Sequence, residues 1–328
     1  MCITERNHPC QLKRIGLAPA SRELTDAAPA WSGRERGART SPSPEPRSKT
    51  MRAGVPPRIL QENRSGVKSP IITLLSDFGL SDGYVAGMKG AILKICRNAV
   101  LVDITHLVPP GDIRAGAFLL AAAYPDFPRG TVHLAVVDPG VGTGRMPLVI
   151  MTPRGFLIGP DNGLFSLVLE KETPTEARAI ENPAFRHSRV SMTFHGRDIF
   201  APAAAHLASG AAFAEFGPVC TPHVARWSRA TRIGDELRGE VIHIDRFGNA
   251  ISNIDEGMLR EFAAKGRARA QIRGQSLPLV STYGDLEPGA AMALIGGGGH
   301  LEIAVNRGSA ADRFRIAPGE PLRVFLDQ

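Results

Sequence analysis

Short apolar runs rich in β-branched residues alternate, from residue 71 to residue 210, with segments whose apolar residues recur at helical spacing. The run over 71–79 ends in Asp and Gly, which is typical of a buried parallel strand followed by a turn. Residues 83–96 show helical spacing, and 100–105 form a further run that predicts another buried strand. Strands that alternate with helices in this way predict a mostly parallel α/β sheet.

The same alternation predicts six further elements before the pattern changes near Leu237. These are a helix over 113–127 stopped by Pro125, a strand and Gly-rich turn over 131–142, two strands across a turn over 148–163, and helices over 165–172 and 198–210. Beyond Leu237 we expect short strands over 239–254, 269–280, 291–306 and 321–326, with one helix over 256–266. The sequence therefore predicts an N-terminal α/β sandwich domain followed by a small C-terminal β-barrel domain.

Charge divides the chain in a different place. The 328 residues carry a net charge of +7, and residues 1–68 contain 13 Lys and Arg against 6 Asp and Glu. Residues 69–328 contain 26 of each and are neutral, so the folded part offers little attraction for nucleic acid. Because residues 1–68 lack hydrophobic periodicity, we expect a disordered basic extension. The predicted organisation is that extension, an α/β domain over 69–236 and a β-barrel domain over 237–328.

The cysteines are scattered and form no C-x-x-C pair, which argues against a zinc site or a disulfide framework. They are Cys2, Cys10, Cys96 and Cys220. The longest apolar run, near 116–124, is too short to span a bilayer, so we expect neither a membrane partner nor export. These features favour a cytoplasmic location.

Polar residues follow three of the predicted strands. Asp77 and Asp82 come after the first strand, and Asp138 and Arg145 come after the third. Because ligands bind beyond the carboxyl ends of parallel strands, these side chains should share one edge of the sheet. A carboxylate such as Asp77 suits a ribose diol, since it accepts two hydroxyl hydrogen bonds, although it also suits a helix cap or a turn.

His195 precedes a predicted helix start and is a further candidate. It is followed by Asp198, an ordinary residue for the first turn of a helix. His195 with Asp138 and Asp198 also has the composition of a metal site, and a lone His is more often structural. The Gly-rich segment 140–145 does not match a dinucleotide or phosphate-binding fingerprint. The residues alone thus indicate an α/β enzyme with a pocket of Asp, Arg and His at the strand ends.

Several of these segments together resemble one family, the S-adenosyl-L-methionine hydroxide adenosyltransferases, which are related to fluorinating and chlorinating enzymes. The matching strings are TLLSDFGLSDGYVAGMKG (73–90), DITHLVPPGDIRAGAFLL (103–120), VVDPGVGTGR (136–145), GPDNG (159–163), FHGRDIFAPAAAHL (194–207), IDRFGNAISNI (244–254) and HLEIAVN (300–306). The resemblance implies an α/β domain joined to a β-barrel and a homotrimer with its sites between subunits.

The resemblance also implies roles for individual residues. The water-activating set of the family falls on Asp138, Arg145 and His195. The position that holds the ribose hydroxyls falls on Asp77. The position near the methionine end falls on Asp82, and a position in the pocket wall falls on Asn162. The C-terminal contacts to methionine and adenine fall on Asp245, Phe247 and Asn249. One departure is the run Gly296–Gly299, where the family often has a polar Asn-Ser pair that contributes ligand contacts.

The implied reaction is hydrolysis of S-adenosyl-L-methionine to adenosine and L-methionine by water attack at the ribose C5′ carbon. Asp138 would accept the proton of the water or orient the water, and Arg145 would hold the Asp138 carboxylate. His195 would complete the hydrogen bonds of the water and pass the proton outward. The reaction needs no metal, nicotinamide or other cofactor. The alternatives are a halogenase-like transferase acting on the same substrate and a non-catalytic nucleoside-binding protein. A third alternative is a protein that binds nucleic acid through its basic tail, and all three rank below hydrolysis.

Overall fold

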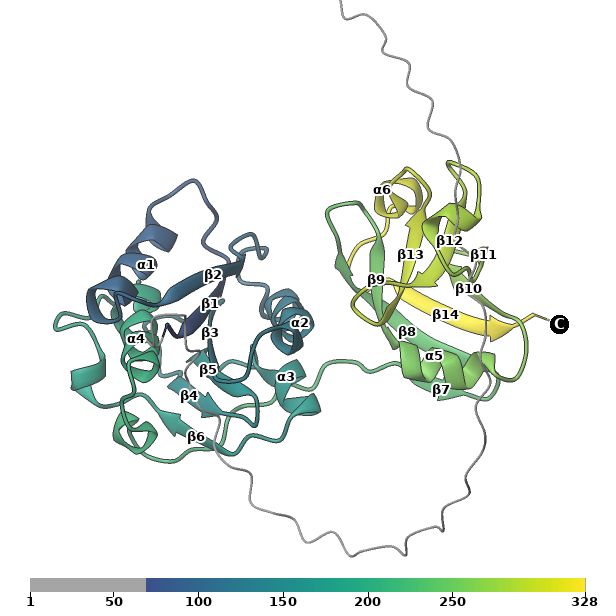
Figure 1. Cartoon of the computed structure of the whole chain (residues 1–328). Coiled ribbons are helices and arrows are strands. Elements are labelled where there is room, and N and C mark those ends of the chain that lie inside the picture. The colour runs from purple at the N-terminus through teal and green to yellow at the C-terminus, as the bar shows by residue number, and fades with distance from the viewer. Residues whose placement is uncertain (1–68, 328) are drawn as a thin grey trace, which may run out of the picture. The chain divides into compact units, whose positions relative to one another are not determined.

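Six strands form the sheet of the α/β domain. The structure, a computed structural model, describes residues 69–327, so the predicted extension over 1–68 lies outside the described residues. The strands are β1 (Ile71–Ser76), β2 (Val100–Thr105), β3 (Thr131–Val136), β4 (Pro147–Met151), β5 (Gly155–Pro160) and β6 (Glu176–Ala179), in the spatial order β2-β1-β3-β5-β4-β6 (Figure 1). The pairs β1–β2, β1–β3 and β3–β5 are parallel, whereas β4 runs antiparallel to β5 and β6. The predicted mostly parallel sheet is confirmed.

Helices cover both faces of this sheet. They are α1 (Tyr84–Ile95), α2 (Ile113–Ala123), α3 (Ser166–Lys171) and α4 (Ala201–Ala208). Figure 1 shows α1 and α4 together on one side of the strands and α2 with α3 on the other. Leu74 packs in the core beneath α1 and α4, and its neighbour Leu75 packs in the core beneath α2 and α3. Successive strand residues point to opposite faces, so one apolar run on β1 supplies both layers of the sandwich.

The prediction that β2 is a buried strand is wrong. No residue of β2 is fully buried, and Val100 is exposed. The reason is its place in the sheet, because β2 lies at the edge and pairs with β1 alone. An apolar run of six residues does not distinguish a central strand from an edge strand. The helix expected over 198–210 also begins earlier, since a π-helical turn over Gly196–Phe200 precedes α4.

The C-terminal strands form one antiparallel sheet that nearly closes on itself. They are β7 (Thr231–Ile233), β8 (Glu236–Ile244), β9 (Ala250–Asp255), β10 (Ala268–Ile272), β11 (Gln275–Pro278), β12 (Ala291–Ile295), β13 (His300–Val305) and β14 (Pro321–Leu326). The order is β11-β10-β14-β8-β9-β13-β12, with β7 paired to β8. A bridge between Leu279 and Ala293 links the segment after β11 to β12 and brings the two edges together. The predicted β-barrel domain is confirmed.

Two helices and several single turns complete the chain. Helix α5 (Glu256–Ala263) is capped by Asp255, whose side chain accepts a hydrogen bond from the N–H of Met258 at 2.8 Å. Helix α6 (Ala310–Phe314) is capped by Ser309 in the same way. Short 3₁₀ turns cover Tyr124–Asp126, Pro183–Phe185, Phe213–Phe216 and Tyr283–Asp285. Among residues 69–327, no helix combines the length and the apolar character that a bilayer crossing requires.

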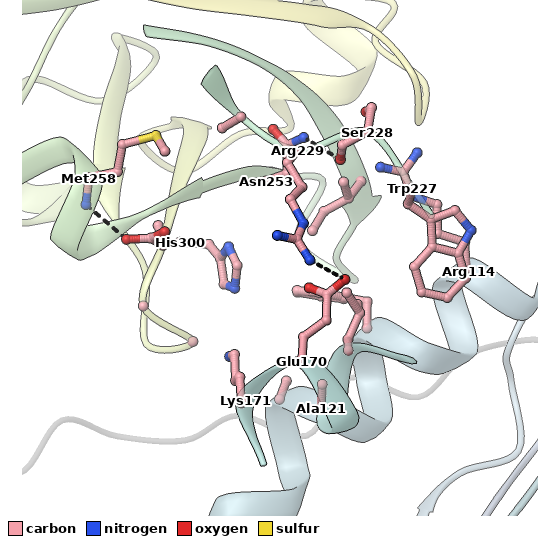
Figure 2. A pocket seen from close by; sticks show the side chains of 18 of the residues that line it. Arg114, Ala121, Glu170, Lys171, Trp227, Ser228, Arg229, Asn253, Met258 and His300 are labelled. Carbon is pink, nitrogen blue, oxygen red and sulfur yellow. Dashed lines mark hydrogen bonds and ion pairs between the residues drawn. The ribbon is translucent and has the colours of Figure 1, made fainter. Parts of the chain in front are cut away.

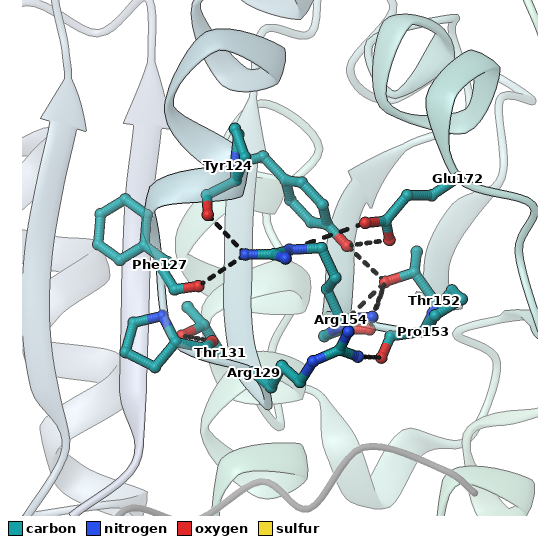
Figure 3. Close-up of polar contacts among 11 residues, drawn as sticks. Tyr124, Phe127, Arg129, Thr131, Thr152, Pro153, Arg154 and Glu172 are labelled. Carbon is teal, nitrogen blue, oxygen red and sulfur yellow. Dashed lines mark hydrogen bonds and ion pairs between the residues drawn. The ribbon is translucent and has the colours of Figure 1, made fainter. Parts of the chain in front are cut away.

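A polar network ties the end of α2 to the β4–β5 hairpin (Figure 3). The hydroxyl of Tyr124 lies 2.6 Å from Thr152 Oγ1 and donates to Glu172 Oε2 at 2.8 Å. Arg154 Nη2 donates to the carbonyl of Pro125 at 2.5 Å. Burial raises the pKa of Tyr124, so its hydroxyl remains a donor at neutral pH. This network lies where β3 begins and leaves the opposite edge of the sheet for the residues that follow the strands.

Candidate active site

Asp138, Arg145 and His195 meet in one hydrogen-bonded set. Arg145 Nε lies 3.0 Å from each carboxylate oxygen of Asp138, and Arg145 Nη2 also donates to Asp138 Oδ2. The same Nη2 lies 2.7 Å from His195 Nδ1. The side chains of Asp138 and Arg145 are only 4% and 9% exposed. Three residues predicted from two segments of the chain therefore form a single buried unit.

The guanidinium determines the state of the imidazole. Arginine can only donate, so His195 Nδ1 must accept, and in the neutral ring the proton then lies on Nε2. Burial lowers the pKa of His195, the neighbouring Arg145 lowers it further, and the nearby carboxylates of Asp138 and Asp198 act in the opposite direction. The lowered pKa keeps His195 neutral at pH 7. It can therefore present an N–H donor while Asp138 presents a carboxylate.

Local backbone features bring the three residues together. Gly142, in the turn between Asp138 and Arg145, has a φ of +76°, and a Cβ there would lie 2.5 Å from the carbonyl oxygen of Met192. Glycine thus permits the turn after β3 to approach the segment that leads to His195. The π-helical turn begins directly after His195 and carries Phe200, whose ring lies 5.2 Å from Arg145 Cζ. Such turns occur frequently at functional sites.

A cavity of about 560 Å³ opens beside this set. Asp77, Asp138 and His195 line it together with three aromatic side chains, Phe78, Tyr84 and Phe194. The ring centroids of these aromatics lie 5.3 to 6.1 Å apart in tilted and edge-to-face arrangements. Sequence reasoning missed the aromatic wall, although Phe78 directly follows Asp77 and Phe194 directly precedes His195. The cavity combines apolar surface with the carboxylates of Asp77 and Asp138, which suits a nucleoside-like ligand.

The other N-terminal candidates have different surroundings. The Asp77 carboxylate lines the cavity and accepts a hydrogen bond from Gly111 N at 2.8 Å through Oδ2. Asp82 is exposed, and its carboxylate accepts from Ser81 Oγ at 3.3 Å. Asn162 Nδ2 donates to the carbonyl of Val137 at 2.8 Å, directly before Asp138. Asn162 therefore supports the end of β3, and neither it nor Asp82 lines the cavity.

Asp245, Phe247 and Asn249 form one tight turn between β8 and β9. Asp245 Oδ1 accepts from the N–H of Phe247 at 2.9 Å and of Asn249 at 2.8 Å, and Oδ2 accepts from Asn249 Nδ2 at 3.0 Å. The Phe247 side chain is 76% exposed. None of the three lines the cavity beside Asp138.

The Gly296–Gly299 turn joins β12 to β13. The N–H of Gly296 donates to His300 O and that of Gly299 donates to Gly296 O, both at 3.0 Å, so two of the four N–H groups are used within the chain. A Cβ at Gly296 would lie 2.3 Å from Glu302 Oε2. Burial raises the pKa of Glu302, and its Oε1 accepts a hydrogen bond from the Tyr283 hydroxyl. The Glu302 carboxyl thus occupies the space that a side chain at position 296 would need.

His195, Asp138 and Asp198, whose residue types would suit a metal ion, do not form a metal site. Asp198 is fully buried and binds Arg197 Nε at 2.6 Å and the N–H of Ser191 at 2.8 Å. Over residues 69–327, no group of three or more His, Cys, Asp or Glu side chains is arranged to hold a metal ion. Asp198 instead anchors the segment that leads into His195.

A second cavity, of about 550 Å³, is shown in Figure 2. Arg114, Phe118, Trp227 and His300 are among the residues that line it, and none of the predicted site residues is. Arg114 Nη2 is paired with Glu240 Oε1 at 2.5 Å. The cavity lined by Asp77, Asp138 and His195 is therefore a different one.

Comparisons with known proteins cover both domains. Residues 72–217 match the family profile described as the SAM hydroxide adenosyltransferase N-terminal domain. Residues 239–323 match the profile described as the C-terminal domain of the same family.

Individual relatives agree with these matches. A Thermus thermophilus protein named (R)-S-adenosyl-L-methionine hydrolase is 41% identical over 262 residues, which cover 77% of this chain and 99% of that protein. A Salinispora arenicola protein of the same name is 39% identical over 267 residues, covering 78% of this chain and 98% of the relative. A Nocardia brasiliensis protein named fluorinase is 28% identical over 291 residues, or 78% and 97% of the two chains.

A solved structure shows the same fold. The crystal structure of an uncharacterized conserved protein from Thermotoga maritima superimposes with a TM-score of 0.74 at 34% identity, and covers 77% of this chain and 99% of that one. The family match over residues 72–217 includes the segments that carry Asp138, Arg145 and His195.

Proposed function

This chain belongs to the SAM hydroxide adenosyltransferase family, and we propose that it hydrolyses S-adenosyl-L-methionine to adenosine and L-methionine. The observation that carries the proposal is the Asp138–Arg145–His195 set at the wall of a cavity that also contains Asp77. Relatives at 39–41% identity that are named (R)-S-adenosyl-L-methionine hydrolase support the same reaction.

The difficult part of this reaction is activation of the water. The substrate's sulfonium is a good leaving group, so the C5′–S bond breaks with its electron pair on sulfur and methionine leaves as a neutral thioether. The water oxygen forms the new bond to C5′ and must lose a proton as it does so. The Asp138 carboxylate takes that proton, and Arg145 holds the carboxylate in position.

His195 orients the same water. With Nδ1 accepting from Arg145, the imidazole offers Nε2–H to one lone pair of the water, which leaves the other lone pair for C5′. The pair of Asp138 and Arg145 is buried, and the scarcity of solvent strengthens these interactions. The groups required are side chains of this chain, and the reaction needs no metal or other cofactor.

The remaining residues bind the substrate in this proposal. Asp77 accepts hydrogen bonds from the ribose hydroxyls, and Asn162 supports the strand end that carries Asp138. Asp82 contributes to the methionine end, and Asp245, Phe247 and Asn249 contribute to the methionine and adenine contacts. The last three do not line the cavity beside Asp138, and Phe247 is largely exposed. Both facts support a homotrimer in which the C-terminal turn of one subunit completes the site of another.

We place the protein in the cytoplasm. Cys96 and Cys220 are free thiols, which is compatible with a reducing compartment.

The proposal is tested by incubating the purified protein with S-adenosyl-L-methionine and following adenosine by chromatography. We expect adenosine from the wild type and a loss of about 100-fold or more in kcat for Asp138→Ala and His195→Ala. Adenosine binding without turnover by the wild type would instead favour a non-catalytic nucleoside-binding protein. Size measurements in solution test the trimer independently.

A further inference from the structure

A second set of polar side chains, joined by hydrogen bonds and ion-pair contacts, leads to the Asp77 turn. Ser76, the last residue of β1, has its Oγ 2.7 Å from His106 Nδ1. His106 Nε2 lies 3.1 Å from Asp103 Oδ1, and Lys89 Nζ lies 2.6 Å from Asp103 Oδ2. Ser76 is fully buried and the His106 side chain is 1% exposed, whereas Asp103 reaches solvent. The set thus runs from a buried strand end to the surface.

The charge of Asp103 indicates which atoms donate and which accept in this set of side chains. Asp103 is ionised, since hydrogen bonds from Lys89 and His106 outweigh the effect of burial and lower its pKa. The nearby Asp103 carboxylate favours the ring proton on His106 Nε2, 3.1 Å from Oδ1, and Nδ1 then accepts from the Ser76 hydroxyl. The Ser76 oxygen in turn accepts from the backbone N–H of Phe78 at 3.3 Å. In this tautomer the Ser76 hydroxyl has an acceptor in His106 Nδ1 and a donor in the N–H of Phe78.

These bonds hold the backbone on both sides of Asp77. Ser76 precedes Asp77 and Phe78 follows it, so one hydroxyl bridges the residues that flank the carboxylate. The same segment is held again by the backbone, because Gly79 N donates to His106 O at 2.8 Å. The Asp77 carboxylate itself accepts from Gly111 N, in the loop that follows His106.

We propose that His106 is a positioning residue, which acts through Ser76 to hold the Asp77 carboxylate in the orientation that receives the ribose hydroxyls. This inference rests on the proposed function for the role of Asp77. Ser76, His106 and Asp103 are the residue types of a nucleophilic triad, but Ser76 is fully buried and its hydroxyl is committed to His106. Ser76 does not reach the substrate, so the set of Ser76, His106 and Asp103 acts on the position of Asp77.

The test uses three variants with different expectations. His106→Ala removes the acceptor of the Ser76 hydroxyl. His106→Asn places an amide oxygen close to the position of Nδ1 and should keep that acceptor. The matched control is His133→Ala, because His133 is equally buried and its Nδ1 lies 2.9 Å from Thr73 Oγ1, also on β1 but away from Asp77. Each variant is checked for folding by circular dichroism and urea denaturation.

Ligand binding gives a measurement that a purely structural role would not affect. Calorimetric titration with adenosine and with 2′,3′-dideoxyadenosine measures how strongly the ribose hydroxyls contribute. We expect His106→Ala to lose roughly tenfold in adenosine affinity, the scale of one hydrogen bond to a charged group, and to keep its affinity for the dideoxy compound. His106→Asn should recover most of the loss, and His133→Ala should lose stability without losing the preference for adenosine.

A double variant tests whether the effect passes through Asp77. If it does, Asp77→Ala with His106→Ala should bind adenosine as Asp77→Ala does alone. Additive losses, or a preference for adenosine that persists in His106→Ala, would overturn the proposal. If His106→Ala does not fold, the more exposed Asp103→Asn should reduce the same preference by about threefold. These titrations do not require turnover, so a wild type that binds adenosine but forms none would refute the hydrolysis without deciding this inference.

Discussion

Arg145 Nη2 lies 2.7 Å from Nδ1 of His195, and the same nitrogen donates to Asp138. The Arg145 guanidinium therefore holds the Asp138 carboxylate in place as an acceptor. It also keeps the His195 imidazole neutral, with its remaining N–H as a donor. Protonation of His195 at Nδ1 would place an N–H against an N–H and break the contact. In the proposed mechanism this arrangement makes Asp138 the proton acceptor and gives His195 the task of orienting the water.

The pH dependence of turnover follows from the lowered pKa of His195. The neutral imidazole is the active form, so kcat/KM should be constant around pH 7 and fall only at a pH below the ordinary histidine value of about 6.5. The glutamine of His195→Gln cannot take up a proton, so the residual kcat/KM of this variant should not fall at that pH. Initial rates of adenosine formation between pH 4.5 and 8 measure this. An unchanged acid limb in His195→Gln would assign it to another group.

Breaking the buried ion pair should destabilise the protein. Arg145→Ala leaves the Asp138 carboxylate buried without its partner, which typically costs about 3–5 kcal/mol in the free energy of unfolding. Asp138→Leu combined with Arg145→Leu removes both charges and should recover much of that loss while staying inactive. Urea denaturation measures both effects. Equal destabilisation of the single and double variants would contradict the explanation by an unpaired charge.

Histidine burial should also make folding sensitive to acid. Burial lowers the pKa of His133 to about 3, whereas in the unfolded chain it lies near 6.5. The unfolded state therefore binds a proton first as the pH falls below about 6.5, and stability is lost at up to about 1.4 kcal/mol per pH unit for this group. Urea denaturation between pH 7.5 and 5 should show the slope, and His133→Asn should reduce it. An equal slope in that variant would exclude His133 as its source.

The Asp138 carboxylate should exclude halide as the nucleophile. A fixed negative charge at the position of the attacking group repels chloride or fluoride. We expect the wild type, supplied with chloride, to form adenosine and no competing amount of 5′-chloro-5′-deoxyadenosine. Asp138→Ala removes the charge and is the variant in which the chlorinated product should first become detectable by chromatography. Its formation by the wild type at a rate comparable to that of adenosine would argue for the halogenase-like alternative.

The glycine run should not tolerate a side chain equally at each position. A Cβ at Gly296 would lie 2.3 Å from Glu302 Oε2, whereas a Cβ at Gly297 meets nothing within 4 Å. Gly296→Ser should therefore lower the unfolding free energy by about 1–3 kcal/mol, and Gly297→Ser should leave it nearly unchanged. Thermal melts compare the two variants, and KM for S-adenosyl-L-methionine shows whether a hydroxyl at either position aids binding. Equal melting temperatures would mean that the Glu302 carboxyl moves aside freely.

Much of the fold follows from local pattern. The apolar runs and helical spacings predicted β1, α1, β3 and α3, since these depend on neighbouring residues. The edge position of β2 was not predictable in this way, because burial of a strand depends on what packs against it. The same limit applies to the π-helical turn after His195, which an ordinary helix start resembles in sequence.

For the site, the sequence by itself determined which residues follow the strands, and hence that Asp77 and Asp138 share one edge of the sheet. Parallel strands end on the same side, so that conclusion needs no coordinates. Only the tertiary structure decided that Arg145 binds Asp138 and His195 together, that aromatic rings line the cavity, and that His106 supports the Asp77 turn. His195 lies 50 positions from Arg145, and His106 lies 30 positions from Ser76. Contacts over such separations arise from packing of the whole domain, which no local pattern encodes.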